Sequence, residues 1–140
     1  MSGPGHAWHL DPRLADDTHP LASWPLCELR LMDDANYPWL VLVPRVAGAV
    51  ELLDLDAAQR HALTDEIDAA ARALRAVARP HKLNVAALGN LVPQLHVHVI
   101  ARFREDPAWP APVWGRVAAR AYTPEALVER ITGLQAALAG

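Results

Sequence analysis

Cysteine is almost missing from this chain, and so is any excess of positive charge. Cys27 is the only cysteine among 140 residues, which excludes an internal disulfide and fits the reducing environment of the cytoplasm. The 13 Lys and Arg residues are outnumbered by 16 Asp and Glu residues, so the formal net charge is −3. This balance is not typical of proteins that bind nucleic acid or anionic membranes. We therefore expect a cytoplasmic protein that binds neither.

Long hydrophobic runs are also missing. No stretch comes near the ~20 consecutive apolar residues that a transmembrane helix needs. Residues 1–10 have neither a basic start nor an apolar segment, so we expect no signal peptide. What the chain does contain is 52% hydrophobic residues, in a length that suits one folding unit. We expect a single globular domain over residues 1–140.

Four segments have the patterns of β-strands. Residues 26–32 alternate between polar and apolar, residues 39–43 are continuously apolar, and the turn-forming residues between them predict an antiparallel hairpin. Residues 82–88 and 94–102 form a second pair around a Gly-Asn turn. Antiparallel strand pairs separated by helices indicate an α+β fold.

The clearest helix lies between the two strand pairs. It begins after Asp56, which makes a capping box with Gln59, and it ends near Arg79. An apolar stripe at spacings of three and four is expected to face the core: Leu63, Ile67, Ala70, Leu74 and Val77. The charged residues are expected on the opposite side: Arg60, Asp65, Glu66, Asp68, Arg72 and Arg75. A second helix, over residues 123–139, has the cap Thr123.

The N-terminal residues are rich in Pro, His and Trp and predict an arm that lies on the domain. Asp11 and Pro12 suit a helix cap and a first helical position, so a short helix is expected there. Trp8 and Trp24 are expected to anchor the arm. Its histidines have no partner at a recognisable spacing, and we expect them to be solvent-exposed or capping residues: His6, His9 and His19.

The most informative segment is Gln-Leu-His-Val-His-Val-Ile at residues 94–100. Its strict alternation predicts a strand whose two faces differ. Gln94, His96 and His98 would lie in a row on one face, with neighbouring side chains about 7 Å apart. The residues expected on the core face are Leu95, Val97 and Val99.

Three interpretations of this row compete. The two histidines could lie on a wet sheet face. They could bind zinc, although the third ligand would have to come from His61, His81 or Cys27. They could also perform nucleophilic catalysis, in which one neutral imidazole attacks phosphorus while the other contacts phosphate or handles the proton of the leaving group. A phosphate could bind to the backbone amides of the upstream turn, Gly89-Asn90, which favours catalysis without a metal or cofactor.

Residues 94–100 resemble the signature of the histidine triad (HIT) superfamily, His-φ-His-φ-His-φ-φ, where φ is apolar. Other elements follow in the order of the family: the strand ending at Val43-Pro44-Arg45, the turn Asp54-Leu55, the long helix, Leu83-Asn84 and Gly89-Asn90. The resemblance covers about residues 20–115. It leaves residues 1–19 as an N-terminal arm and residues 123–139 as a C-terminal helix.

The resemblance implies a five-stranded antiparallel sheet with a long helix and a C-terminal helix, assembled as a homodimer. It also implies a nucleotide hydrolase or nucleotidyl transferase that acts at the α-phosphate of a small molecule, such as a dinucleoside polyphosphate or a nucleoside phosphoramidate. His96 would be the nucleophile and form a nucleotidyl-histidine intermediate. His98 would contact the phosphate and assist the leaving group.

The resemblance further assigns residues around the nucleotide. Asp33 would bind the ribose hydroxyls and Asn84 would lie near the phosphate. The loop of Gly89 and Asn90 would face the phosphate.

Gln94 is a departure from the family pattern, because it stands in the place of the first triad histidine. The resemblance extends to a bacterial group of these proteins that has Gln in this place. Glutamine cannot carry a proton, but it keeps one acceptor and two donors. Two alternatives to catalysis follow: a nucleotide-binding protein with little turnover because of Gln94, and a His-x-His metal-binding protein. Trp109 and Trp114 lie where several family members close the site with a tryptophan.

Overall fold

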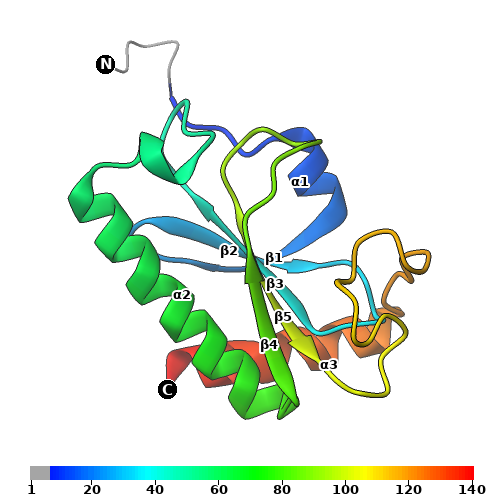
Figure 1. The fold of residues 1–140 in the computed structure, drawn as a ribbon. Helices are drawn as coiled ribbons and strands as arrows, with labels where there is room; N and C mark the ends of the chain where they lie inside the picture. Colours follow the sequence, from blue (N-terminus) through cyan, green and yellow to red (C-terminus); the bar gives the residue numbers. More distant parts are fainter. Residues whose placement is uncertain (1–6) are drawn as a thin grey trace.

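Five strands form one antiparallel sheet in the computed structural model, which describes residues 7–140 (Figure 1). The strands are β1 (Thr18–Ser23), β2 (Cys27–Met32), β3 (Trp39–Pro44), β4 (Lys82–Ala86) and β5 (Val97–Arg102). Their order across the sheet is β1-β2-β3-β5-β4, so β5 is interior and β4 lies at an edge. The predicted α+β fold and its five-stranded antiparallel sheet are confirmed.

The helical elements of the described chain are α1 (Pro12–Asp17), the 3-10 turn η2 (Leu52–Asp54), α2 (Ala57–Ala78) and α3 (Pro124–Ala139). α2 is the predicted long helix, with a capping box of Asp56 and Gln59 and a left-handed residue, Arg79, at its end. The side chains of Asp11 and Thr123 cap α1 and α3, each by accepting a backbone hydrogen bond. No helix of the described chain is long and apolar enough to cross a membrane.

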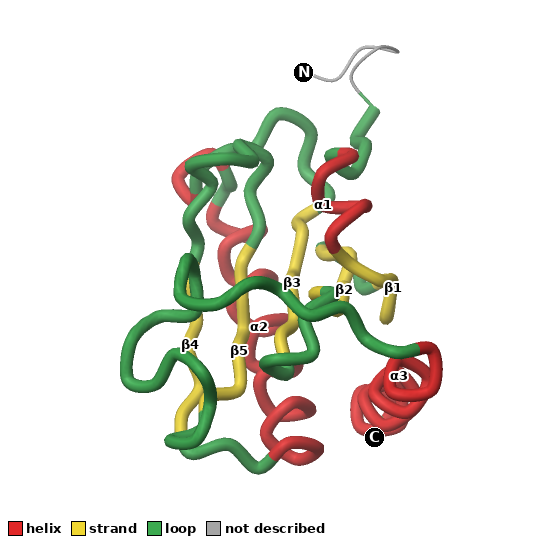
Figure 2. The backbone as a smooth tube through the Cα atoms, turned by 90° about the vertical axis from the view of Figure 1, so that its right-hand side faces the viewer, coloured by secondary structure: helices red, strands yellow, loops and turns green. Residues whose placement is uncertain are grey.

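Each face of the sheet has its own core. α2 and α3 cover one face, where their apolar residues pack against alternate residues of the strands. The residues predicted to face the core from the last strand lie here: Leu95, Val97 and Val99. The other face packs against α1 and against the loop of residues 103–119, which crosses in front of the sheet in Figure 2. The candidate site lies on this second face.

The predicted N-terminal arm leads into β1, one of the two edge strands of the sheet, which begins at Thr18. β1 pairs with β2, with a register shift between Pro20 and Ala22. Proline is tolerated at an edge because it has no N–H to donate to a neighbouring strand. Trp8 and Trp24 each pack against one of the two cores. Residues 1–6 lie outside the described residues. They include His6 and part of the segment that was inspected for a signal peptide.

Glu66 departs from the charge pattern expected for α2. It is only 9% exposed, and its carboxylate oxygens accept hydrogen bonds from the backbone N–H groups of Leu26 at 2.9 Å and Cys27 at 2.8 Å. Glu66 lies three residues after Leu63 and therefore on the apolar stripe of the helix. Burial, together with the Glu66 carboxylate, raises the pKa of the Cys27 thiol, so this cysteine stays protonated.

Candidate active site

His96 and His98 lie where a loop enters the middle of the sheet. β5 begins at Val97, so His98 is within the strand, paired with Val41 and Ala86, while His96 immediately precedes it. The two imidazole rings meet edge to face with centroids 4.9 Å apart, and the residues are 7% and 4% exposed. Two adjoining imidazoles withdrawn from water do not fit the interpretation of a wet sheet face.

The ring of His98 is held by tryptophans. Nε1 of Trp39 donates a 2.9 Å hydrogen bond to Nδ1 of His98, and the ring of Trp114 packs against the same imidazole at a centroid distance of 5.1 Å. Burial, reinforced by the neighbouring His96, lowers the pKa of His98 to about 3. His98 is therefore neutral at physiological pH. Because its Nδ1 accepts a hydrogen bond, its proton is on Nε2.

A backbone carbonyl holds the ring of His96. Nδ1 of His96 lies 2.7 Å from the carbonyl oxygen of Gln94. A carbonyl oxygen can only accept a hydrogen bond, so Nδ1 carries the proton. The neutral ring then has its lone pair on Nε2, which is the form that can attack an electrophile.

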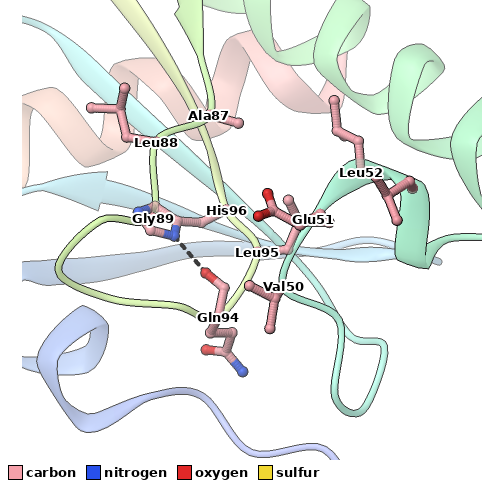
Figure 3. A pocket seen from close by; sticks show the side chains of 10 residues that line it. Val50, Glu51, Leu52, Ala87, Leu88, Gly89, Gln94, Leu95 and His96 are labelled. Atoms are coloured by element: carbon pink, nitrogen blue, oxygen red, sulfur yellow. Dashed lines mark hydrogen bonds between the residues drawn. The ribbon is translucent and has the colours of Figure 1, made fainter.

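The side chain of Gln94 does not join the two histidines, which differs from the predicted row. The chain before β5 is not part of the sheet, and the N–H of Leu95 donates to the carbonyl of Ala49 in a loop. Figure 3 shows the Gln94 side chain directed away from His96. Its Oε1 accepts a hydrogen bond from the N–H of Asp11 at 2.8 Å, and its Nε2 donates to the carbonyl of His9 at 2.7 Å.

A hollow of about 360 Å³ opens on the two histidines. Its walls are largely apolar: Leu14, Met32, Trp39, Leu91, Val92 and Trp114. Gly89 and Asn90 also line it. Gly89 has a φ of +82°, a conformation that glycine adopts without strain. An apolar slot that ends at two imidazoles and a glycine turn suits a nucleobase with a phosphate at one end.

A second hollow, of about 310 Å³, adjoins the first at Leu88, Gly89 and His96. Figure 3 shows the side chains that line it, with the carboxylate of Glu51 directed inward. Its other lining residues are mainly aliphatic, as at Val50. A group attached to a phosphate at His96 therefore has space on more than one side.

Two residues assigned to the nucleotide lie apart from the histidine pair. Oδ1 of Asp33 is 3.2 Å from Nε2 of His19 and accepts a hydrogen bond from the N–H of Tyr122. Asp33 lines a neighbouring hollow and neither of the two that open on the histidines. Oδ1 of Asn84 accepts a 2.8 Å hydrogen bond from Arg102. Asn84 pairs with Ile100, two residues along β5 from His98, and lines neither of the two hollows that open on the histidines. The structure thus does not bring these two side chains to the histidines.

Several residues of the main hollow were not identified from the sequence, among them Trp39, Leu14 and Asp17. Trp39 has the pattern of a core strand, and only the pairing of β3 with β5 places it beside the histidines. Leu14 and Asp17 reach the hollow from α1, which is distant in sequence. Of the two tryptophans considered for closing the site, Trp114 lines the hollow, whereas Trp109 packs against His81 elsewhere.

The metal interpretation lacks a third ligand. Within residues 7–140, no group of three His, Cys, Asp or Glu side chains is arranged to hold a metal ion. Cys27, one of the candidate third ligands, lies in the core on the opposite face of the sheet.

Comparisons with known proteins agree with this geometry. The model of the HIT domain family matches residues 15–105. A crystal structure of a histidine triad protein from Bradyrhizobium japonicum has a TM-score of 0.92 and 48% identity, covering 94% of this chain and 98% of that one. A histidine triad protein from Marinobacter aquaeolei VT8 has a TM-score of 0.92 and 44% identity, covering 95% and 97%.

A curated relative, AP-4-A phosphorylase of Mycobacterium tuberculosis, is 38% identical over 50% of this chain and 40% of that protein. The chain thus matches less than half the length of this relative. The family model, in contrast, covers more than half of the chain, and the two bacterial structures match it almost end to end. The chain therefore belongs to the histidine triad (HIT) domain family.

Proposed function

We propose that the protein is a nucleotide hydrolase or nucleotidyl transferase that acts at the α-phosphate of a small nucleotidyl substrate. The observation that carries this proposal is the state of His96, whose Nδ1–H is held by the carbonyl of Gln94 and whose Nε2 is left as the nucleophile. The apolar hollow beside it has room for a base. Membership of the HIT family and the similarity to AP-4-A phosphorylase support a nucleotide as the substrate.

The reaction consists of two displacements at phosphorus. The Nε2 lone pair of His96 bonds to the α-phosphorus as the bond to the leaving nitrogen or oxygen breaks; the leaving atom keeps the electron pair and takes a proton from solvent. The resulting nucleotidyl-imidazolium keeps its Nδ1–H on the carbonyl of Gln94. Water then attacks the phosphorus, a proton returns to solvent, and the mononucleotide leaves a neutral His96.

His98 suits the role of a phosphate contact. Its Nε2–H can donate a hydrogen bond to a phosphoryl oxygen. Because its pKa is lowered to about 3, it holds almost no imidazolium at neutral pH with which to protonate a leaving group. Of the two roles that the resemblance implies for His98, this environment favours the contact with phosphate.

The charges around the two hollows favour a leaving group with little negative charge. Among their described lining residues the charged side chains are Asp17 and Glu51, with no Lys or Arg. Polyphosphates are usually bound through Lys, Arg or a metal ion, which neutralise their charge. We therefore propose nucleoside phosphoramidates as better substrates than dinucleoside polyphosphates.

A panel of nucleotidyl substrates tests the proposal. Adenosine and guanosine 5′-phosphoramidates and diadenosine tetraphosphate are incubated with the parent protein and with His96→Ala, and mononucleotide release is followed by chromatography. We expect the parent to favour a phosphoramidate, and His96→Ala to lose activity by about a thousandfold or more, as removal of a covalent nucleophile does. Equal hydrolysis by the parent and by His96→Ala would rule out the mechanism.

A nucleotide-binding protein with little turnover is the second candidate, and it depends on the missing triad histidine. The Gln94 side chain is bonded to the N-terminal segment and not to His96, so the contact that orients the nucleophile is kept. This favours turnover. Calorimetry that shows AMP or GMP binding, combined with no hydrolysis of any panel substrate, would select the second candidate.

We also propose the homodimer that the resemblance implies. β4 is an edge strand, in which Val85 is 53% exposed, and Leu88, just after the strand, is 51% exposed. An edge with open backbone groups and apolar side chains can pair with a second copy. Light scattering is expected to give twice the 15.3 kDa mass of the chain. A monomer at assay concentration would refute this part of the proposal.

A further inference from the structure

We propose that Arg102 is a positioning residue of the active site: with Asp106 and Asn84 it holds the loop of residues 103–114 in the conformation that places Trp114 against His98. The inference rests on the proposed function, because His98 is the residue through which Arg102 affects turnover. Arg102 lines neither of the two hollows that open on the histidines, so it acts on the site from outside.

The guanidinium of Arg102 ties the end of β5 to β4 and to the loop that follows. Its Nε and Nη2 donate to the two carboxylate oxygens of Asp106 at 2.9 Å and 3.1 Å. Its Nη1 donates to Oδ1 of Asn84 in β4, and its Nη2 also donates to the carbonyl of Ala111, both at 2.8 Å. The side chains of Arg102 and Asp106 are only 2% and 4% exposed. A buried ion pair adds little net stability over apolar residues of the same volume, but its bidentate geometry permits few orientations of the two partners.

Asp106 shapes the first half of the loop around this pair. Its carboxylate oxygens also accept hydrogen bonds from the backbone N–H groups of Phe103, Ala108 and Trp109, at 3.0 Å, 3.1 Å and 2.8 Å. Residues 103–114, which the structure describes in full, contain no helix or strand. Bonds to a buried carboxylate therefore satisfy backbone groups that no regular ladder pairs. The ring of Trp109 lies over the guanidinium at 5.8 Å, within the range of a cation–π contact.

The second half of the loop leads from Arg102 to the histidine. Beyond the bond at Ala111, Val113 is 4% exposed and belongs to the same core cluster as Trp39. The next residue, Trp114, meets the rings of Trp39 and His98 edge to face, at centroid distances of 5.7 Å and 5.1 Å. Arg102 and His98 share one face of β5 but are four residues apart, about 13 Å along the strand. Arg102 therefore reaches His98 through the loop and not by contact.

Trp114 and Trp39 together enclose the imidazole of His98. Trp39 donates to its Nδ1, while Trp114 packs against the ring at the wall of the main hollow. Burial is the main cause of the low pKa of His98, so the neutral state of the ring depends on this cover. A loop that no longer held Trp114 in place would let water reach the ring and would leave its Nε2–H less well aimed at a phosphate.

The position of Trp114 is tested without substrate, by NMR titration of ring-labelled histidine. Arg102→Lys keeps the charge but cannot make the bidentate pair. We expect His98 of the parent to stay neutral in mild acid, and its pKa to rise by about one pH unit or more in both Arg102→Lys and Trp114→Ala, because water then reaches the ring. Glu66→Ala is the control for lost stability, since Glu66 is bonded to Leu26 and Cys27 away from this loop, and it should leave the His98 titration unchanged.

An unchanged His98 titration in Arg102→Lys would overturn the proposal. Asn84→Ala is the second variant, because it removes one hydrogen bond to the guanidinium and keeps the ion pair. It should raise the pKa of His98 in the same direction but by less. If Arg102→Lys does not fold, an unchanged His98 titration in Asn84→Ala overturns the proposal equally.

A double-mutant cycle on kcat/KM with a nucleoside phosphoramidate tests whether Arg102 acts through Trp114. We expect Arg102→Lys to lower kcat/KM about fivefold and Trp114→Ala about tenfold. The double variant should be no slower than Trp114→Ala alone, because both changes remove the same contact with His98. Losses that multiply in the double variant would show that Arg102 acts by another route and would overturn the proposal.

The two experiments separate this proposal from the proposed function. A raised His98 pKa in Arg102→Lys, with no turnover of any nucleotidyl substrate by the parent, would remove the hydrolysis and leave the positioning role standing. Turnover by the parent that depends on His96, with a His98 titration unchanged in Arg102→Lys, would remove the positioning role and leave the hydrolysis.

Discussion

His96 is oriented by Gln94 through the backbone carbonyl, which lies 2.7 Å from its Nδ1 atom, and not through the Gln94 side chain. The carbonyl is present whatever side chain residue 94 carries. The side-chain amide instead joins His9 and Asp11 to the loop before β5. The departure from the triad pattern therefore leaves the His96 ring with its proton on Nδ1, as the proposed role of nucleophile requires.

Gln94→Ala tests this separation of roles. We expect the His96 ring to keep its proton on Nδ1, because the carbonyl acceptor remains. Nitrogen NMR of ring-labelled histidine in the parent and the variant reports the tautomer directly. A variant in which His96 carries its proton on Nε2 would show that the side chain is needed to set the nucleophile.

Trp39→Phe should weaken catalysis through His98. The substitution keeps an aromatic ring but removes the Nε1–H donor to Nδ1 of His98. A net hydrogen bond is worth about 1 kcal/mol, so kcat/KM is expected to fall about fivefold. Trp114→Phe is the matched control, because Trp114 packs against His98 with no hydrogen bond to it among the described contacts. Equal losses in the two variants would assign the effect to ring packing.

Buried neutral His98 makes the protein less stable in mild acid. Its pKa is lowered from 6.5 to about 3 in the folded protein, so between these pH values the unfolded chain binds a proton that the folded protein does not. The contribution of His98 to the free energy of unfolding is fully present above pH 6.5. It is lost by about 1.4 kcal/mol per pH unit as the pH falls from 6.5 towards 3. Urea unfolding of the parent and of His98→Gln measures this: the parent should lose the larger share of its stability on acidification. Parallel pH profiles would contradict the buried neutral state.

Glu66→Ala should destabilise the protein by about 2–3 kcal/mol. It removes the acceptor of two hydrogen bonds, from the N–H groups of Leu26 and Cys27, and leaves both donors without a partner at the start of β2. Asp68→Ala on the same helix is the control. Its ion pair with Arg72 is solvent-exposed, so a loss below about 0.5 kcal/mol is expected. Urea melts of the two variants give the comparison, and equal losses would mean that the Glu66 hydrogen bonds contribute little.

Local patterns in the sequence predicted what depends on local structure. The start and end of α2 follow from Asp56, Gln59 and Arg79, whose capping geometry involves only nearby backbone groups. The alternation of polar and apolar residues around His96 and His98 predicted that the two histidines share one face of a strand. This too is a local property, because successive side chains of a strand point to opposite faces.

The remaining features depend on contacts between segments that are distant in sequence. Glu66 is buried because two backbone donors from another element need an acceptor, which no helical pattern reveals. Trp39 meets His98 only through the register of β3 on β5. Gln94 turns away from the histidines because the sheet begins after it and the N-terminal segment offers a donor and an acceptor.

The covalent intermediate is the central claim. The parent protein is mixed with a nucleoside phosphoramidate labelled at the α-phosphate, quenched within one turnover, digested and analysed by mass spectrometry, with His96→Ala treated in parallel. We predict a mononucleotide adduct on His96 that is labile in acid and stable in alkali, and none on the variant. Turnover by the parent with no adduct on His96, or an adduct on another residue that persists in His96→Ala, would contradict the account.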